Sequence, residues 1–180
     1  MIYVFLANGF EELEAIAPID VLRRAGSNVV TVGVGSKQIT SAHNIGFTAD
    51  ITAEEIRLSP DLEMIILPGG MPGADNLENS PEVQAAIDYC AENERWIAAI
   101  CAAPKILGHK GLLAGKRCTC FPGYEKDLKS AVVMPELVVK DGRFVTAKGA
   151  GAALRFALKL VEVLFGKEKS SALSSSMQYK

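Results

Sequence analysis

The sequence predicts an α/β fold in which helices cover both faces of a mostly parallel sheet. Short apolar segments rich in strand-forming residues alternate along the chain with segments of helical periodicity. This alternation is typical of a parallel sheet whose two faces are both buried. No internal repeat and no linker divides the 180 residues, so we expect one domain over residues 1–180.

The first half of the chain is expected to place a long helix between strands. Its strands are Ile2–Ala7, Asn28–Val34 and Leu62–Leu67. Between the first two strands, Glu11–Ala25 has helical periodicity and is followed by Gly26, a residue typical of the position just past a helix end. The third strand is stopped by Pro68-Gly69-Gly70.

Capping and turn residues mark the elements of the second half. The expected helices are Pro81–Glu94, Lys105–Leu113 and Gly151–Phe165, and the expected strands are Trp96–Ile100 and the pair Leu137–Lys140 and Phe144–Thr146. Ser80 is a suitable N-cap for the first of these helices, and Asp141-Gly142-Arg143 joins the last two strands in a hairpin. The tail from Gly166 to Lys180 is polar and serine-rich, so we expect it to be loose or only lightly docked.

Composition and charge exclude several classes of function. The formal net charge is −2 and the basic residues are scattered, which does not indicate a nucleic-acid partner. No apolar run approaches the ~20 residues of a membrane span. The apolar start Met1–Leu6 lacks the basic region of a signal peptide, so we expect a cytoplasmic protein with reduced thiols.

The sequence carries no strong signal for a metal or a cofactor. Cys118 and Cys120 have no nearby histidine, which makes a zinc site unfavourable and core packing the better interpretation. Gly149-Ala150-Gly151 lacks the fuller nucleotide fingerprint and is interpreted as a helix-start turn. We therefore expect neither a metal nor a cofactor.

Cys101 ends an apolar strand and is followed by small residues, a proline and a helix-like stretch. The start of a helix favours an anion, and for a cysteine that anion is the nucleophilic thiolate. The alternative is a buried core cysteine, since free cysteine is among the most buried residue types. This segment alone leaves both interpretations open.

Two further features are expected at the same edge of the sheet, because ligand sites of open α/β sheets lie at the carboxyl ends of strands. Glu14 shares an apolar helix face with Ala17, Pro18 and Val21, so burial would raise its pKa and make it a candidate acid/base. Pro68-Gly69-Gly70 allows close backbone approach, and the N–H groups of Gly70 and Ala102 could form an oxyanion hole. For Glu11 and Glu12, a favourable interaction with the helix dipole is the simpler interpretation.

Five ordered motifs resemble the ThiJ/PfpI superfamily, in the branch of the parkinsonism-associated protein deglycase. They are Gly9-Phe10-Glu11-Glu12-Leu13-Glu14, Pro18 to Gly26, Leu67-Pro68-Gly69-Gly70, Ala99-Ile100-Cys101-Ala102-Ala103-Pro104 and Lys148-Gly149-Ala150-Gly151. The resemblance implies a flavodoxin-like three-layer α/β/α sandwich, similar to class I glutamine amidotransferases, and a homodimer, with residues 15–26 as part of the interface. It also implies that Cys101 is the reactive cysteine, Glu14 its carboxyl partner, and the Gly70 and Ala102 amides the oxyanion donors.

The chain departs from this family pattern at positions around the expected pocket. The protease-like branch has a histidine directly after its cysteine, where this chain has Ala102, so peptidase chemistry is disfavoured. The deglycase branch often has a histidine before a proline, where this chain has Phe121 before Pro122. His43 stands about where the branch often places an anion-facing arginine. These changes affect the polarity of the pocket and the choice of substrate.

The resemblance implies two classes of function. The first is a cofactor-independent glyoxalase or deglycase acting on methylglyoxal-type 2-oxoaldehydes or their early adducts, with a Cys101 thiolate and Glu14 as acid/base. The second is an oxidative-stress sensor or protective chaperone whose Cys101 is oxidised to sulfinic acid without useful turnover. The expected partners are a small reactive carbonyl compound and a second copy of the chain.

Overall fold

The computed structural model describes residues 1–179 and confirms the predicted fold class. Its main sheet has seven strands in the order β10 (Val138–Asp141), β11 (Phe144–Ala147), β7 (Trp96–Ile100), β6 (Met64–Leu67), β1 (Ile2–Leu6), β2 (Val29–Gly33) and β5 (Ile51–Thr52). All neighbouring strands pair in parallel except β10 and β11, which form the predicted antiparallel hairpin.

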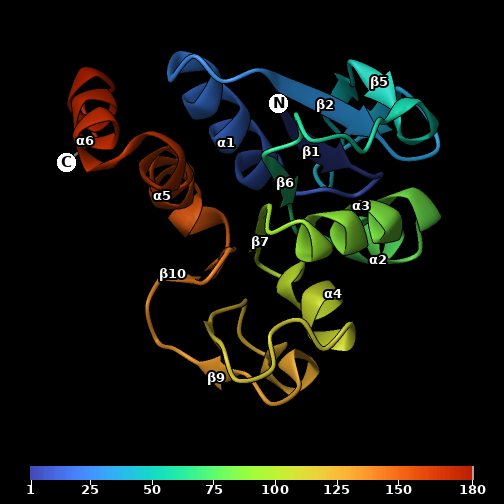
Figure 1. Ribbon diagram of the computed structural model, residues 1–180. Helices are drawn as coiled ribbons and strands as arrows, with labels where there is room; N and C mark the ends of the chain where they lie inside the picture. The colour runs from blue at the N-terminus through green and yellow to red at the C-terminus, as the bar shows by residue number, and fades with distance from the viewer. Residues whose placement is uncertain (180) are drawn as a thin grey trace.

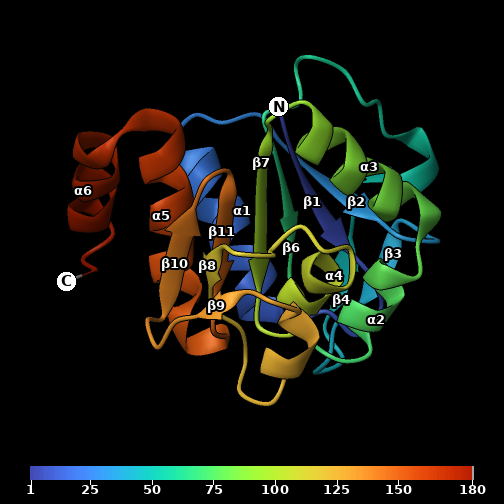
Figure 2. The same ribbon diagram turned by 60° about the horizontal axis from the view of Figure 1, so that its bottom comes forward.

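Helices cover both faces of this sheet (Figures 1 and 2). One face is covered by α1 (Glu12–Arg24) and α5 (Ala153–Phe165), and the other by α2 (Gly73–Glu78), α3 (Pro81–Glu92) and α4 (Pro104–His109). Successive residues of β1 alternate between the two resulting cores: Val4 and Leu6 pack on the α1 side, and Tyr3 and Phe5 on the α3 side. The central strands are therefore buried on both faces, as their continuous apolar sequences predict.

Of the two alternatives for the tail, loose or only lightly docked, the structure excludes the loose one. Residues Lys167–Ser176 form α6, which packs against α5 (Figure 1). The Ser170 hydroxyl is buried and donates a hydrogen bond of 2.8 Å to the carbonyl of Leu158 on α5. Leu173 and Met177 pack against the core at helical spacing from Ser170. The segment is thus mainly polar in composition, but one face of α6 packs against α5.

Several short strands outside the main sheet were not predicted from the sequence. β3 (Gln38–Thr40) and β4 (Gly46–Thr48) form a small hairpin, and β8 (Arg117–Cys118) pairs with β9 (Val132–Val133). The helix after Cys101 ends at His109 instead of Leu113, because the chain turns at Gly111, which has a φ of +72°. None of the helices within residues 1–179 is long and apolar enough to cross a membrane.

Candidate active site

The predicted site residues converge where β6 and β7 end. These two strands are adjacent and parallel, with Leu67 opposite Ala99, so Gly69 and Cys101 leave the sheet at the same edge. An added side-chain carbon on Gly69 would lie 2.6 Å from Cβ of Cys101 and 2.7 Å from Oε2 of Glu14. The cysteine, the glycine turn and the carboxyl group are therefore in direct contact, as expected from the sequence.

Cys101 occupies a strained turn directly after β7. Its φ is +66°, a left-handed conformation that costs a residue other than glycine roughly 1–2 kcal/mol. Two backbone hydrogen bonds hold it there: its N–H donates to the carbonyl of Ala147 at 2.9 Å, and its carbonyl accepts from the N–H of Phe121 at 2.8 Å. Cys101 is partly exposed, whereas Cys90, Cys118 and Cys120 are buried. The turn thus presents one thiol of the four at the sheet edge.

Glu14 lies in the first turn of its helix and has no exposed surface. Its Oε2 accepts a hydrogen bond of 2.9 Å from the N–H of Gly69. Its Oε1 is buried and has no hydrogen-bond partner among residues 1–179. Burial raises the pKa of this carboxyl group to about 7, against the opposing effects of the Cys101 thiol and the Gly69 N–H. Glu14 is thus a carboxylic acid that titrates near neutral pH.

Cys101 and Glu14 form a coupled pair. Burial, followed by the charge of an ionised Glu14, raises the pKa of the Cys101 thiol to about 12, in contrast to the lowered value expected from the sequence. A proton on Glu14 removes that repulsion. Two N–H groups, those of Gly70 and Ala102, stabilise charge on the sulfur, whereas a single N–H stabilises charge on Glu14. These donors lower the pKa of the thiol but do not offset its burial, so Cys101 keeps its proton until a neighbouring base, such as the Glu14 carboxylate, accepts it.

The glycines of the β6 turn are required by close backbone contacts. Gly70 has a φ of +86°, and an added side-chain carbon would lie 2.4 Å from the backbone nitrogen of Glu11. The backbone N–H groups of Gly70 and Ala102 both interact with the Cys101 sulfur and lower its pKa. The two amides that the sequence proposed as oxyanion donors are therefore both beside the sulfur.

Phe121 and His43, two of the departures from the family pattern, lie in different surroundings. Phe121 borders the site, since its N–H binds the Cys101 carbonyl and its ring packs against Gly149. His43 is exposed and binds Glu12 through Nδ1, at 2.8 Å from Oε2. No hydrogen bond or ion pair joins His43 to Cys101 within the part of the chain that the structure describes.

Glu12 has a larger role than the interaction with the helix dipole predicted for it. Its carboxylate accepts hydrogen bonds from the Ser41 hydroxyl and from the backbone and ring of His43, so it ties the loop between β3 and β4 to α1. These contacts lower its pKa to about 2, although its partial burial opposes the shift. Glu11, Glu12 and His43 also form a group with metal-ligand atoms within 4.8 Å of one another, but capping and these internal bonds already engage them.

Sequence reasoning missed the contribution of the segment after β11. Gly149 lies between the ring of Phe121 and Glu14: an added side-chain carbon would be 3.2 Å from Cδ2 of Phe121 and 3.8 Å from the unpartnered Oε1 of Glu14. The interpretation of Gly149-Ala150-Gly151 as a helix-start turn fits the short helical turn Ala150–Ala152 that leads into α5. Its place beside the carboxyl group follows from the β7–β11 pairing, which local sequence does not reveal.

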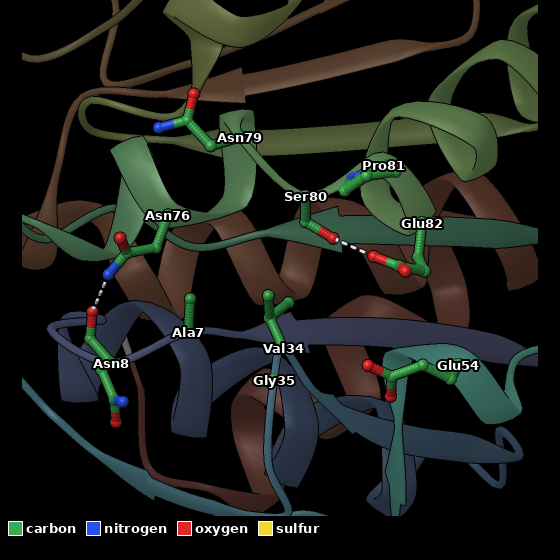
Figure 3. A pocket seen from close by; sticks show the side chains of 10 residues that line it. All are labelled: Ala7, Asn8, Val34, Gly35, Glu54, Asn76, Asn79, Ser80, Pro81 and Glu82. Carbon is green, nitrogen blue, oxygen red and sulfur yellow. Dashed lines mark hydrogen bonds between the residues drawn. The ribbon is translucent and has the colours of Figure 1, made fainter.

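A second cavity lies at the same edge of the sheet, beyond the ends of β1 and β2 (Figure 3). It has a volume of about 370 Å³ and contains none of the predicted site residues. Its polar groups are largely paired with one another: Asn76 donates to the carbonyl of Asn8 at 2.9 Å, and Ser80 donates to Glu82 at 2.7 Å (Figure 3). We call this the Asn76 cavity.

Comparison with known proteins relates most of the chain to one family. The DJ-1/PfpI family model matches residues 1–163. The chain is 38% identical over 174 residues to Protein DJ-1 homolog A of Arabidopsis thaliana, covering 94% of this chain but 44% of that longer protein. It is 32% identical over 165 residues to the Glutathione-independent glyoxalase DJR-1.2 of Caenorhabditis elegans, covering 91% of this chain and 87% of the relative.

Solved structures agree with this relationship. A mutant of a DJ-1 superfamily protein from Salmonella typhimurium superposes with a TM-score of 0.93 at 34% identity, covering 99% of this chain and 98% of the other. Oxidised Toxoplasma gondii DJ-1 superposes with a TM-score of 0.94 at 31% identity, covering 99% and 97%. With a family match over most of its length, this flavodoxin-like chain belongs to the DJ-1/PfpI family.

Proposed function

We propose that this protein is a glutathione-independent glyoxalase or deglycase that acts on methylglyoxal-type 2-oxoaldehydes or their early adducts. The observation that carries the proposal is the contact between a partly exposed cysteine and a buried carboxyl group with a pKa of about 7 and one free oxygen. A nucleophile and a neutral-pH acid/base are what the reaction needs. A relative that is 32% identical is named a glutathione-independent glyoxalase.

The reaction begins with attack of the Cys101 sulfur on the aldehyde carbon of the 2-oxoaldehyde. The new C–S bond converts the carbonyl to a hemithioacetal, and the negative charge moves to its oxygen. The N–H groups of Gly70 and Ala102, which are directed at the sulfur, are suitably placed to stabilise that oxygen. The Glu14 carboxylate accepts the proton of the thiol as the sulfur attacks and passes it to that oxygen, so that the carboxylate is again a base for the next step.

Glu14 then moves a proton between the two reacting carbons. Its carboxylate removes the proton from the hemithioacetal carbon to give an enediol, and the resulting acid returns a proton to the neighbouring carbon. The product is a thioester of Cys101, and water cleaves the C–S bond to release lactate from methylglyoxal. The unpartnered Oε1 is the oxygen available for this transfer, which explains why a buried polar atom is left unsatisfied.

Lactate production from methylglyoxal without glutathione tests this proposal. We expect turnover in the wild type and its loss in both Cys101→Ser and Glu14→Gln. Cys90→Ala, which changes a thiol buried beneath α3, is the matched control and is expected to retain activity. Full lactate production by Cys101→Ser would contradict the mechanism.

A second candidate function is oxidative sensing, favoured by the partial exposure of Cys101 alone among the four thiols. Peroxide would oxidise the Cys101 thiol to sulfenic acid with release of water, and a second peroxide would give sulfinic acid with release of a second water. A protonated Glu14 beside the sulfur could then donate a hydrogen bond to the oxidised group. Peroxide titration followed by intact mass and peptide mapping tests this: addition of two oxygens selectively at Cys101 supports sensing, and unselective oxidation opposes it.

We further propose that the protein is a homodimer formed through α1 and the start of α5. Leu13 and Ile16 on α1 and Leu154 on α5 are 59%, 41% and 38% exposed, and they line one apolar groove. This face overlaps residues 15–26, the segment expected from the resemblance to contribute to an interface. Ile16→Glu should convert the dimer to a monomer in light scattering, and an unchanged mass would contradict this interface.

A further inference from the structure

Lys148 stands beside the reactive cysteine in the sheet. It is the first residue after β11, and β11 pairs in parallel with β7 so that Ala147 lies opposite Ile100. The next residues along the two strands are Lys148 and Cys101, and the N–H of Cys101 donates to the carbonyl of Ala147. The backbones of Lys148 and Cys101 are therefore neighbours at the edge of the sheet.

The Lys148 side chain lines two cavities that meet at Pro122. One is mainly apolar, has a volume of about 270 Å³ and is bordered by Phe121, Leu137 and Gly149. The other has a volume of about 310 Å³ and is bordered by Thr119, Cys120 and Glu125. Because Gly149 also lies against Oε1 of Glu14, the apolar cavity shares a wall with the catalytic carboxyl group.

Two polar groups of these cavities have no partner. Lys148 makes no ion pair and no side-chain hydrogen bond within residues 1–179, although Glu125 borders the same cavity. The Thr119 hydroxyl oxygen is fully buried and also lacks a hydrogen-bond partner in the described chain. Lys148 and Thr119 border one cavity, but the Thr119 hydroxyl has no exposed surface, so Lys148 is the group that a ligand can reach. A carboxylate bound in either cavity would accept a charge-assisted hydrogen bond from the Lys148 ammonium group.

We propose that the apolar cavity bordered by Phe121 and Leu137 binds the part of the substrate remote from the reacting carbonyl, and that Lys148 selects substrates whose remote part carries a carboxylate. This inference rests on the proposed function and specifies its substrate class. Methylglyoxal leaves this cavity empty. A 2-oxoaldehyde or early adduct with an apolar body and a terminal carboxylate fills it, with the body on Phe121 and the charge at Lys148.

Two synthetic substrates that differ by one carboxylate test the selection. Phenylglyoxal has the apolar body alone, and 4-carboxyphenylglyoxal adds the anion. We expect kcat/KM of the wild type to favour the carboxylated compound by about two- to fivefold, the effect of one partly exposed charge pair. The preference should decrease at high salt, because solvent-exposed charges are screened.

Variants of Lys148 assign the preference to its charge. Lys148→Gln should reduce the ratio of the two kcat/KM values to about one, and Lys148→Arg should retain it. Lys140→Gln, which changes a lysine on β10 outside both cavities, is the matched control and should keep the wild-type ratio. A wild-type ratio of one, or a ratio that Lys148→Gln leaves unchanged, would overturn the proposal.

Binding to an inactive variant separates this inference from the proposed function. Calorimetry with Cys101→Ser compares 4-carboxymandelate with mandelate, the expected products of the two substrates. Tighter binding of 4-carboxymandelate that is lost in Cys101→Ser/Lys148→Gln supports the carboxylate site even if the wild type turns over neither aldehyde. Equal binding of both ligands would oppose the site even if methylglyoxal is converted to lactate.

Discussion

Two regions at the carboxyl edge of the sheet differ in how their polar groups are satisfied. The Asn76 cavity, beyond β1 and β2, has a volume of about 370 Å³, and Asn76 and Ser80 form hydrogen bonds with other residues that line it (Figure 3). The site beyond β6 and β7 holds a cysteine at φ +66° and a buried carboxyl oxygen without a partner. Both regions have the same topological position, so position alone does not distinguish them.

The two regions differ in backbone strain and in unsatisfied polar groups, and both features point to the Cys101 region as the candidate active site. A protein keeps a left-handed cysteine and an orphaned carboxyl oxygen only where the surrounding structure compensates their cost, and such features concentrate at functional sites. In the Asn76 cavity, Ser80 caps α3 and Asn76 fastens α2 to the end of β1, which are structural tasks. The comparison leads to predictions for matched variants in the two regions.

The largest expected effect is a difference in kcat/KM between variants of two glutamates. Glu14→Gln should lower kcat/KM for methylglyoxal by about 10²–10⁴-fold, the usual contribution of a general acid/base, because an amide cannot exchange the proton. Glu82→Gln, in the Asn76 cavity, should stay within about twofold of the wild type. Steady-state lactate assays measure both. Similar losses in the two variants would remove the distinction between the regions.

A second contrast compares two glycines. Gly69→Ala would place a methyl group 2.6 Å from Cβ of Cys101 and 2.7 Å from Oε2 of Glu14, and these groups must separate. We expect at least about tenfold lower activity and a loss of roughly 1–3 kcal/mol in the free energy of unfolding. Gly46→Ala, where the added carbon meets nothing within 4 Å, should change neither. Denaturant unfolding and the lactate assay test the pair, and wild-type activity in Gly69→Ala would argue against the tight contact.

The dependence of stability on pH should also report Glu14. The folded protein holds this proton up to a pKa of about 7, whereas an unfolded glutamate releases it near 4.5. Wild-type stability should therefore fall as the pH rises from about 4.5 to 7, by at most roughly 3 kcal/mol. Glu14→Gln should lose this slope and melt several degrees above the wild type at pH 8. Thermal scans alongside Glu82→Gln correct for the loss of one carboxyl group, and parallel curves for Glu14→Gln and the wild type would contradict the raised pKa.

The smallest expected effect lies in the Asn76 cavity. Ser80→Ala removes the N-cap of α3, whose hydroxyl accepts a hydrogen bond from the N–H of Val83 at 3.3 Å. This should cost about 1 kcal/mol of stability and leave kcat/KM within about twofold. Chemical denaturation and the lactate assay measure the two effects. A large loss of activity with intact folding would give this cavity a functional role.

The sequence predicted those parts of the fold and site that local patterns encode. Apolar strands, the Ser80 cap and the glycine turn after β6 are signals within a few residues, and they placed Cys101, Glu14 and Gly70 at one edge through the known geometry of parallel sheets. The docked α6 was missed because its contact with α5 depends on three residues in a polar helix.

Other features depend on contacts between distant segments. The attachment of His43 to Glu12 joins residues 31 positions apart, and the place of Lys148 beside Cys101 follows from strand pairing across 47 positions. The pKa of Cys101 was also misjudged from the turn alone, because the charge of Glu14 and the burial of the thiol act on it from outside that turn. Such effects require the assembled structure.

The pH dependence of Cys101 alkylation tests most directly whether the thiol and Glu14 titrate as one coupled pair. The rate of iodoacetamide labelling at Cys101, followed by peptide mass, should rise with an apparent pKa above the ~8.5 of an ordinary thiol, because burial and the charge of Glu14 both disfavour the thiolate. Glu14→Gln should lower that apparent pKa, because it removes the neighbouring negative charge. An apparent pKa below about 8 in the wild type, or one that Glu14→Gln leaves unchanged, would contradict the coupling.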